Sequence, residues 1–151
     1  MHAPAPADTT PEPMQRGNLF SAACPSRSVL QHVTSRWGVL VLVALLGGGT
    51  LRFGDLRRRI GGVSERMLAQ TLNWLESDGF VVRTEHPVQP PHVDYRLTPL
   101  GREVGRHVHE LFDWIEGRMP AIQEARERQD EAAGAPAPQA RQRPKKRIVR
   151  S

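Results

Sequence analysis

The fold is predicted from three stretches of the sequence, RFGDLR at residues 52–57, VSERMLAQTL at 63–72 and PPHVDYRLTPLG at 90–101. The first two have the apolar spacing of short helices, and the third alternates like a strand after a proline-rich turn. Two helices followed by a hairpin are typical of a winged helix-turn-helix, whose second helix fits a duplex groove. We therefore predict a mainly α fold with a small β-hairpin (α+β).

The second stretch predicts the helix that would contact DNA bases. Its start can be capped by the Ser64 hydroxyl, and inward-facing leucines follow at positions 68, 72 and 75. The expected base-contacting residues are Ser64, Arg66, Gln70 and Asn73. A guanidinium can donate two hydrogen bonds to guanine, and side-chain amides pair with adenine. This face therefore predicts binding to double-stranded DNA.

A hairpin is expected after this helix. Residues 93–98 alternate apolar and polar side chains, which predicts a half-buried strand, and residues 80–85 can pair with it. Prolines 87, 90 and 91 lie in the connection, where they stiffen a projecting tip. Basic residues of the preceding helix and of the wing are expected to contact the DNA backbone. They are Arg57, Arg58, Arg59, Arg83, His92 and Arg96.

Two helices are predicted before these stretches. Residues 26–33 place apolar side chains on one helix face. The apolar run at residues 36–46 fits a buried strand as well as a buried helix, because periodicity does not separate the two. The glycines at 47–49 and the length of the run favour a helix.

A long amphipathic helix is predicted after the hairpin. From residue 99 to Met119, apolar side chains recur at spacings of three and four, which forms one continuous stripe. A helix of roughly twenty residues is longer than a domain this small, so we expect its C-terminal half to pack against a partner helix.

The composition indicates one domain with charged ends. The 151 residues are 38% hydrophobic and 25% charged, which is ordinary for a soluble globular protein. The formal net charge is +5, and residues 136–151 alone hold six basic side chains and no acid. Any basic surface on the folded part therefore depends on where its charges lie.

Both ends are expected to be disordered, because they combine proline, alanine and charge without apolar periodicity. We assign residues 1–19 to an N-terminal tail, 20–128 to the folded domain and 129–151 to a basic C-terminal tail. The first residues lack the pattern of a secretory signal, and the longest apolar run is too short for a bilayer span. We expect a cytoplasmic protein without a membrane partner.

An ordered set of motifs runs through residues 24–119. It consists of Cys24-Pro25, Trp37, residues 52–56, residues 64–72, Leu75-Glu76-x-x-Gly79, residues 90–98 and Gly101. By this set the chain resembles the HxlR-type winged helix-turn-helix transcriptional regulators of bacteria and archaea. The resemblance implies a homodimer, joined through its first and last helices, that binds paired half-sites and represses or activates nearby genes; we expect a repressor. The implied interface residues are Val29, Leu30, Val33, Val108, Leu111, Phe112, Ile115 and Met119.

Cys24 is the only cysteine, so a disulfide can form only between two copies of the chain. Some members of the family that the chain resembles sense oxidants, quinones or aldehydes through a cysteine at the corresponding place. Cys24 is therefore a candidate redox sensor for a small electrophile or oxidant. Its thiol is reactive only if it is exposed and stabilised as thiolate, for instance by Arg27 or by the following helix start. The alternatives are an inert, partly buried cysteine and a regulator with a non-covalent small-molecule effector.

No metal site, cofactor or catalytic site is predicted. His107 and His109 are two apart in a helix and point to different sides, and the other histidines are scattered, so we expect surface residues. The sequence holds no nucleophile and base set, phosphate loop or nucleotide fingerprint, so we expect no enzyme. The remaining alternative is a protein-interaction module on a winged scaffold, which an apolar exposed face on residues 64–78 would favour.

Overall fold

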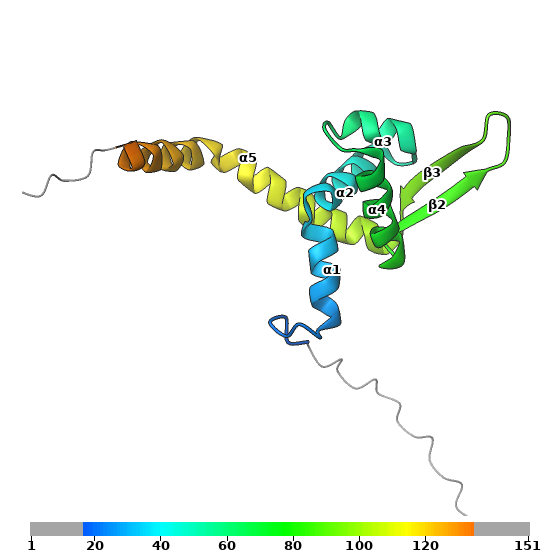
Figure 1. The fold of residues 1–151 in the computed structure, drawn as a ribbon, viewed down its shortest axis with the longest axis horizontal. Coiled ribbons are helices and arrows are strands. Elements are labelled where there is room, and N and C mark those ends of the chain that lie inside the picture. Colours follow the sequence, from blue (N-terminus) through cyan, green and yellow to red (C-terminus); the bar gives the residue numbers. More distant parts are fainter. Residues whose placement is uncertain (1–16, 135–151) are drawn as a thin grey trace, which may run out of the picture. The chain divides into compact units, whose positions relative to one another are not determined.

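The computed structural model describes residues 17–134, and Figure 1 labels its helices and strands. In chain order they are α1 (Pro25–Thr34), α2 (Arg36–Gly48), β1 (Leu51–Arg52), α3 (Phe53–Arg59), α4 (Glu65–Ser77), β2 (Val81–His86), β3 (His92–Leu97) and α5 (Pro99–Gly134). The chain divides into two compact units, one of residues up to Glu110 and one of residues from Leu111, with the boundary inside α5. The predicted mainly α fold with a small sheet is confirmed.

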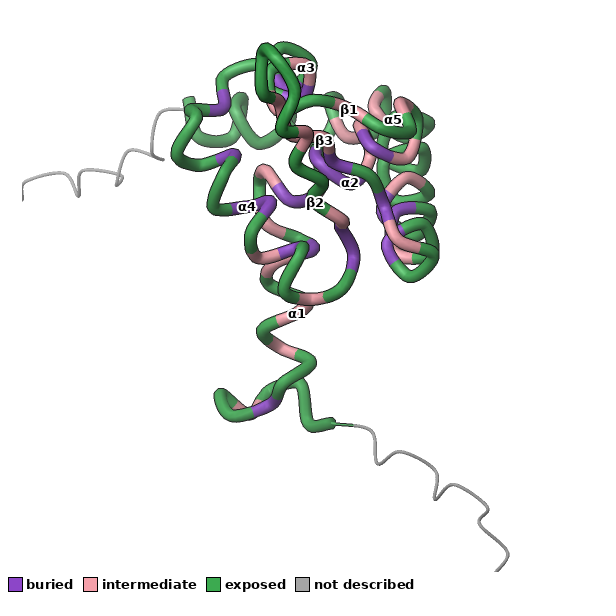
Figure 2. The backbone as a smooth tube through the Cα atoms, turned by 90° about the vertical axis from the view of Figure 1, so that its right-hand side faces the viewer, coloured by how far each residue is buried: buried purple, intermediate pink, exposed green. Residues whose placement is uncertain are grey.

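The apolar run that fits a strand or a helix forms the helix α2. The Ser35 hydroxyl accepts a hydrogen bond from the Gly38 N–H at 3.1 Å, which caps the start of the helix. Gly49 ends it with a φ of 71°, a conformation that side-chain-bearing residues rarely adopt. Val41 and Leu42 are fully buried, and Figure 2 shows α2 among the buried segments. α2 is therefore a core helix of the first unit.

α1 is joined to α2 through Ser35 and contacts α4 through its last turn. His32 of α1 places its Nδ1 atom 2.7 Å from Oδ2 of Asp78, just beyond the end of α4, and its ring stacks on Trp74. The axes of α1 and α2 are bent by 71°. Among residues 17–134, no single helix is long and apolar enough to span a bilayer. Within this range, only α1 and α2 taken together, as a bent pair, reach the length and apolarity of such a span.

The sheet has three antiparallel strands in the order β1-β3-β2. Leu51 of β1 lies opposite Tyr95, and Val81 of β2 lies opposite Leu97. Tyr95 and Leu97 are buried, so the central strand carries the inner face of the sheet. β1 was not predicted from the sequence, because two residues are too few to show an alternation.

Both boundaries of the folded region differ from the sequence prediction. α5 continues to Gly134 instead of ending near Arg128, because residues 121–134 are rich in alanine, glutamate, arginine and glutamine, which favour helix. At the other end, the Ser21 N–H donates to the Asn18 carbonyl at 3.0 Å, so a turn begins within the expected tail. The rest of the two predicted tails, residues 1–16 and 135–151, lies outside the described residues.

Candidate nucleic-acid interface

α3 and α4 form a helix-turn-helix in the first unit. The chain turns between them through Gly62, whose φ of 88° suits glycine. Ile60 and Val63 are buried on the two sides of this glycine and anchor the turn in the core. The Ser64 hydroxyl accepts a hydrogen bond from the Met67 N–H at 3.1 Å, which confirms the predicted cap of α4.

α4 has one buried face and one exposed face. Leu68, Leu72 and Leu75 are at most 1% exposed, as their spacing predicted. The opposite face exposes polar side chains at spacings of four and three, and these are Arg66, Gln70 and Asn73, with Ser64 at the helix start. Within residues 17–134, the side chains of Arg66, Gln70 and Asn73 make no hydrogen bond or ion pair, so their polar groups are available to a ligand.

The three arginines at the end of α3 have different neighbours. Arg57 places its Nη1 atom 3.5 Å from the Oε1 atom of the first residue of α4, so it lies beside the start of that helix. Arg58 is largely exposed and pairs with Asp55, one turn earlier in α3. The Arg59 guanidinium lies at the C-terminal end of α2, where a Cβ on Gly48 would be 2.8 Å from its Nη1 atom. Of the three, Arg57 is therefore the one that lies beside the start of α4, whereas the charge of Arg59 faces the C-terminal end of α2.

The wing places its basic residues on two faces. Side chains alternate along a strand, and the register sets Arg83 of β2 opposite Tyr95 of β3. Arg83 therefore lies on one face of the hairpin, and His92 and Arg96 lie on the other. Arg83 Nη1 lies 2.6 Å from Oε1 of Glu85, and this carboxylate, helped by Tyr95, raises the pKa of Arg83 above its ordinary value. The guanidinium is thus charged but already paired within the wing.

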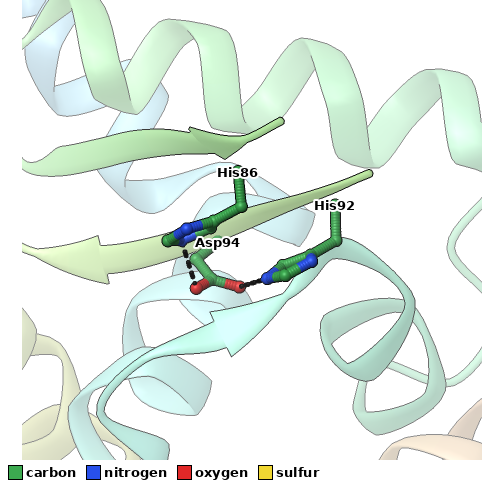
Figure 3. Close-up of side chains that lie close together, drawn as sticks. All are labelled: His86, His92 and Asp94. Carbon is green, nitrogen blue, oxygen red and sulfur yellow. Dashed lines mark ion pairs between the residues drawn. The ribbon is translucent and has the colours of Figure 1, made fainter. Parts of the chain in front are cut away.

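One group of side chains on the wing was missed in the sequence. His86, His92 and Asp94 lie together on one face of the hairpin, and Figure 3 shows both imidazoles beside the same carboxylate. The prediction that the histidines are scattered is therefore wrong for His86 and His92. The available signal was the pattern His92-x-Asp94 in a strand, which puts both side chains on one face, but the partner His86 depends on the register.

Cys24 lies at the N-terminal cap position of α1 and is 8% exposed. The turn that precedes it covers its sulfur, since a Cβ on Gly17 would lie 2.8 Å from the Cys24 Sγ atom. The Arg27 guanidinium donates a hydrogen bond to the carbonyl of Phe20 at 3.5 Å. The structure thus places the thiol at the start of α1 and limits the access of solvent to it.

The residues expected at a homodimer interface fall into two groups. Val33 and Val108 are 7% and 8% exposed and belong to the core of the first unit, so their side chains are covered within one chain. The others keep more accessible apolar surface. In the first unit these are Leu30, which is exposed, and Val29, which is half-buried; in the second unit Leu111, Phe112 and Ile115 are exposed and Met119 is half-buried.

The sequence matches a known family over most of the described region. Residues 32–123 match the family model of the HxlR-like helix-turn-helix. The HTH-type transcriptional regulator YtfH of Escherichia coli (strain K12) is 62% identical over 109 residues, which are 72% of this chain and 86% of that protein. The family match includes α2, the helix-turn-helix and the wing.

Two solved structures are similar to this chain in fold and sequence. YtfH from Salmonella typhimurium has 62% sequence identity and a TM-score of 0.70, and the match covers 74% of this chain and 99% of that one. The redox regulator HypR in its oxidized form has 32% identity and a TM-score of 0.57, with 62% of this chain and 96% of that one covered. Each match spans nearly the whole of the compared chain.

Proposed function

This chain belongs to the HxlR-like helix-turn-helix family and is a transcriptional regulator with a helix-turn-helix DNA-binding domain, and we propose that it binds paired half-sites in duplex DNA as a homodimer. In this proposal α4 enters the major groove and contacts base edges. Paired half-sites follow from the two-fold symmetry of a dimer.

The observation that carries this proposal is the exposed face of α4. Arg66, Gln70 and Asn73 lie on the side of α4 that points away from its buried leucines, and all three carry groups that form paired hydrogen bonds with purines. An exposed apolar face would support a protein-interaction module instead. The three polar residues favour base contacts, each of which discriminates by about 1–3 kcal/mol against a wrong base.

Backbone contacts are assigned to the basic residues around α4. In the proposal, phosphates on either side of the groove are contacted by Arg57 and Arg58 at the end of α3 and by His92 and Arg96 on one face of the wing. Arg83, on the other face of the wing, joins them when it leaves Glu85. Their contacts carry little sequence information. Neutralising Arg57 or Arg58 should weaken binding to all duplexes alike and flatten the dependence of affinity on salt by about one unit.

A homodimer is supported by the apolar surface that α1 and α5 expose. Leu30 is 43% exposed in the first unit, and Leu111 is 55% exposed in the second. Ile115 follows Leu111 by one helical turn, which gives an apolar stripe of the kind that packs against an identical helix. We assign this stripe and the exposed side of α1 to the dimer interface, and we expect the regulator to act as a repressor.

The proposal is tested by the sequence profile of the bound DNA. Duplexes selected from a random pool by the wild-type protein should contain two related half-sites. Selection with Gln70→Ala or Asn73→Ala should relax the profile at one or two base pairs in each half-site and leave the other positions unchanged. The matched control is Gln123→Ala, which removes the same amide from an exposed position in α5. Profiles that do not differ between Gln70→Ala and the control would refute the assignment of α4.

Redox sensing by Cys24 is a second proposal. It is supported by the position of Cys24 at the start of α1 and by the similarity to the redox regulator HypR. Two Cys24 thiols of a dimer would lose two protons and two electrons to an oxidant such as diamide, which is reduced to its hydrazine, and one intermolecular disulfide would form. The 8% exposure of Cys24 predicts that this reaction is slow unless the turn before α1 opens.

The test compares DNA binding before and after diamide treatment in the wild type and in Cys24→Ser. The proposal predicts a change in affinity that dithiothreitol reverses and that Cys24→Ser lacks. A response that persists in Cys24→Ser, or no response in the wild type, would reject redox sensing by this thiol. Either result leaves the DNA-binding proposal standing, because that proposal depends on α4 and not on Cys24.

A further inference from the structure

We propose that His86, His92 and Asp94 form a binding site on the wing for a divalent transition-metal ion, with Zn²⁺ as the ion that best fits the ligands. The hairpin register assembles the three residues, since His86 lies directly opposite His92 and Asp94 follows His92 by two positions. Alternation then places all three side chains on one face of the hairpin. Their ligand atoms all lie within 4.8 Å of one another.

The three side chains converge on a common point. The Nε2 atom of His86 is 2.8 Å from one carboxylate oxygen of Asp94, and the Nε2 atom of His92 is 3.9 Å from the other. The two imidazole rings stack with their centroids 4.6 Å apart. Figure 3 shows that the rings come from neighbouring strands and flank the carboxylate. Small side-chain rotations would bring the three ligand atoms to the roughly 3.3 Å separation that tetrahedral Zn²⁺ requires.

The ligand types select the class of ion. Two imidazole nitrogens and one carboxylate oxygen suit Zn²⁺, Cu²⁺, Ni²⁺ or Fe²⁺, whereas Ca²⁺ and Mg²⁺ prefer oxygen ligands alone. Three protein ligands leave a fourth tetrahedral position for water or another group. The side chains of His92 and Asp94 are 22% and 21% exposed, and that of His86 is 38% exposed, so an ion can enter from solvent and still be partly shielded.

An ion at this place would tie the two strands together next to the tip. His86 and His92 are the last pair of the β2–β3 ladder, and residues 87–91 connect them. A metal ion that bridges them would fix the end of the ladder and order the connection. This inference does not depend on DNA binding, because it concerns only the geometry and chemistry of the hairpin.

The experiment is calorimetric titration of the full-length, metal-free protein with ZnCl₂. The wild type should bind Zn²⁺ at this site, and His92→Gln and Asp94→Asn should each weaken that binding by at least about tenfold. The matched control is His107→Gln, which makes the same change at an exposed position in α5 and should keep the wild-type affinity. Circular dichroism of every variant separates loss of a ligand from loss of fold.

A second measurement identifies the ligands. Co²⁺ in place of Zn²⁺ should give the strong visible absorption of a tetrahedral site with nitrogen and oxygen ligands, and this absorption should disappear in His86→Gln and remain in His107→Gln. The inference is overturned if the wild type takes up no Zn²⁺. It is equally overturned if folded His92→Gln and Asp94→Asn bind Zn²⁺ as tightly as the wild type, because the ion would then occupy a different site.

Discussion

Gly101 lies where the start of α5 meets the backbone before β2. Thr98 holds this junction, because its N–H donates to the Phe80 carbonyl at 3.0 Å and its hydroxyl donates to the Gly79 carbonyl at 2.6 Å. A Cβ on Gly101 would lie 2.0 Å from the Phe80 carbonyl oxygen, a backbone atom that cannot move without breaking the junction. The absence of a side chain at Gly101 is therefore a packing requirement.

We predict that Gly101→Ala lowers the free energy of unfolding by about 1–3 kcal/mol, because the new methyl group overpacks the contact with Phe80. The matched control is Gly105→Ala, one turn later in the same helix, where the nearest atoms would be 3.6 Å away. That change should be neutral or slightly stabilising, since alanine favours helix over glycine. Urea unfolding measures both, and equal midpoints for the two variants would contradict the close contact at Gly101.

For single residues, the sequence predicts helix caps and buried side chains, because these depend on spacing within one element. Ser64 as a helix cap and the buried leucines of α4 follow from positions three and four apart, and the structure confirms them. The contact of His32 with Asp78 and the cluster around Asp94 could not be predicted, because they join residues from different elements. The sequence also does not show which basic side chains share a face of the wing, since a one-residue change of register would move a strand's side chains to the opposite face.

Within the wing, the proposed phosphate contact of Arg83 competes with an ion pair. Arg83 is paired with Glu85 on the same strand and must give up this partner to contact a phosphate. Both side chains are substantially exposed, so the pair is worth little and can exchange in solution. Glu85 thus lowers the contribution that Arg83 can make to DNA affinity.

We predict that Glu85→Gln raises the affinity for specific and non-specific duplexes alike, by about twofold to fivefold, because Arg83 is released for phosphate contact. Fluorescence anisotropy at fixed salt measures this change. Glu103→Gln makes the same change in net charge at an exposed position of α5 and should have a smaller effect. An equal gain in both variants would show that net charge, and not the release of Arg83, is responsible.

Sequence patterns identify a helix or strand well when the element is long enough to show its periodicity. The helices of the helix-turn-helix and both strands of the wing follow from spacing, and the structure changes their ends by only one or two residues. The apolar run of α2 was ambiguous because a buried helix and a buried strand have the same continuous hydrophobicity. β1 could not be found at all, since only its pairing with β3 defines it.

At the level of the whole molecule, binding to a paired site requires two copies of the chain. One copy offers one recognition helix, and the affinity for a paired site comes from two such helices acting together. The apolar residues that α5 exposes in the second unit are the surface assigned to this association. Leu111 and Ile115 are 55% and 37% exposed.

We predict that Leu111→Glu combined with Ile115→Glu converts the dimer to a monomer, because two carboxylates would be buried in an apolar interface. The affinity for a paired site should then fall by about 100-fold or more, since the two half-sites no longer act together. Leu40→Glu is the control, as Leu40 is a leucine of α2 with 42% exposure. Sedimentation velocity measures the association state, and a double variant that still sediments as a dimer would exclude this interface.

We propose that α4 recognises a base sequence through its exposed polar face. The most direct measurement is the ratio of two dissociation constants for the wild-type protein at one salt concentration, one for the selected duplex and one for a duplex of the same composition in scrambled order. If α4 reads bases, the selected duplex should bind more tightly by about 1,000-fold or more, as sequence-specific regulators show. Equal dissociation constants for the two duplexes would contradict it.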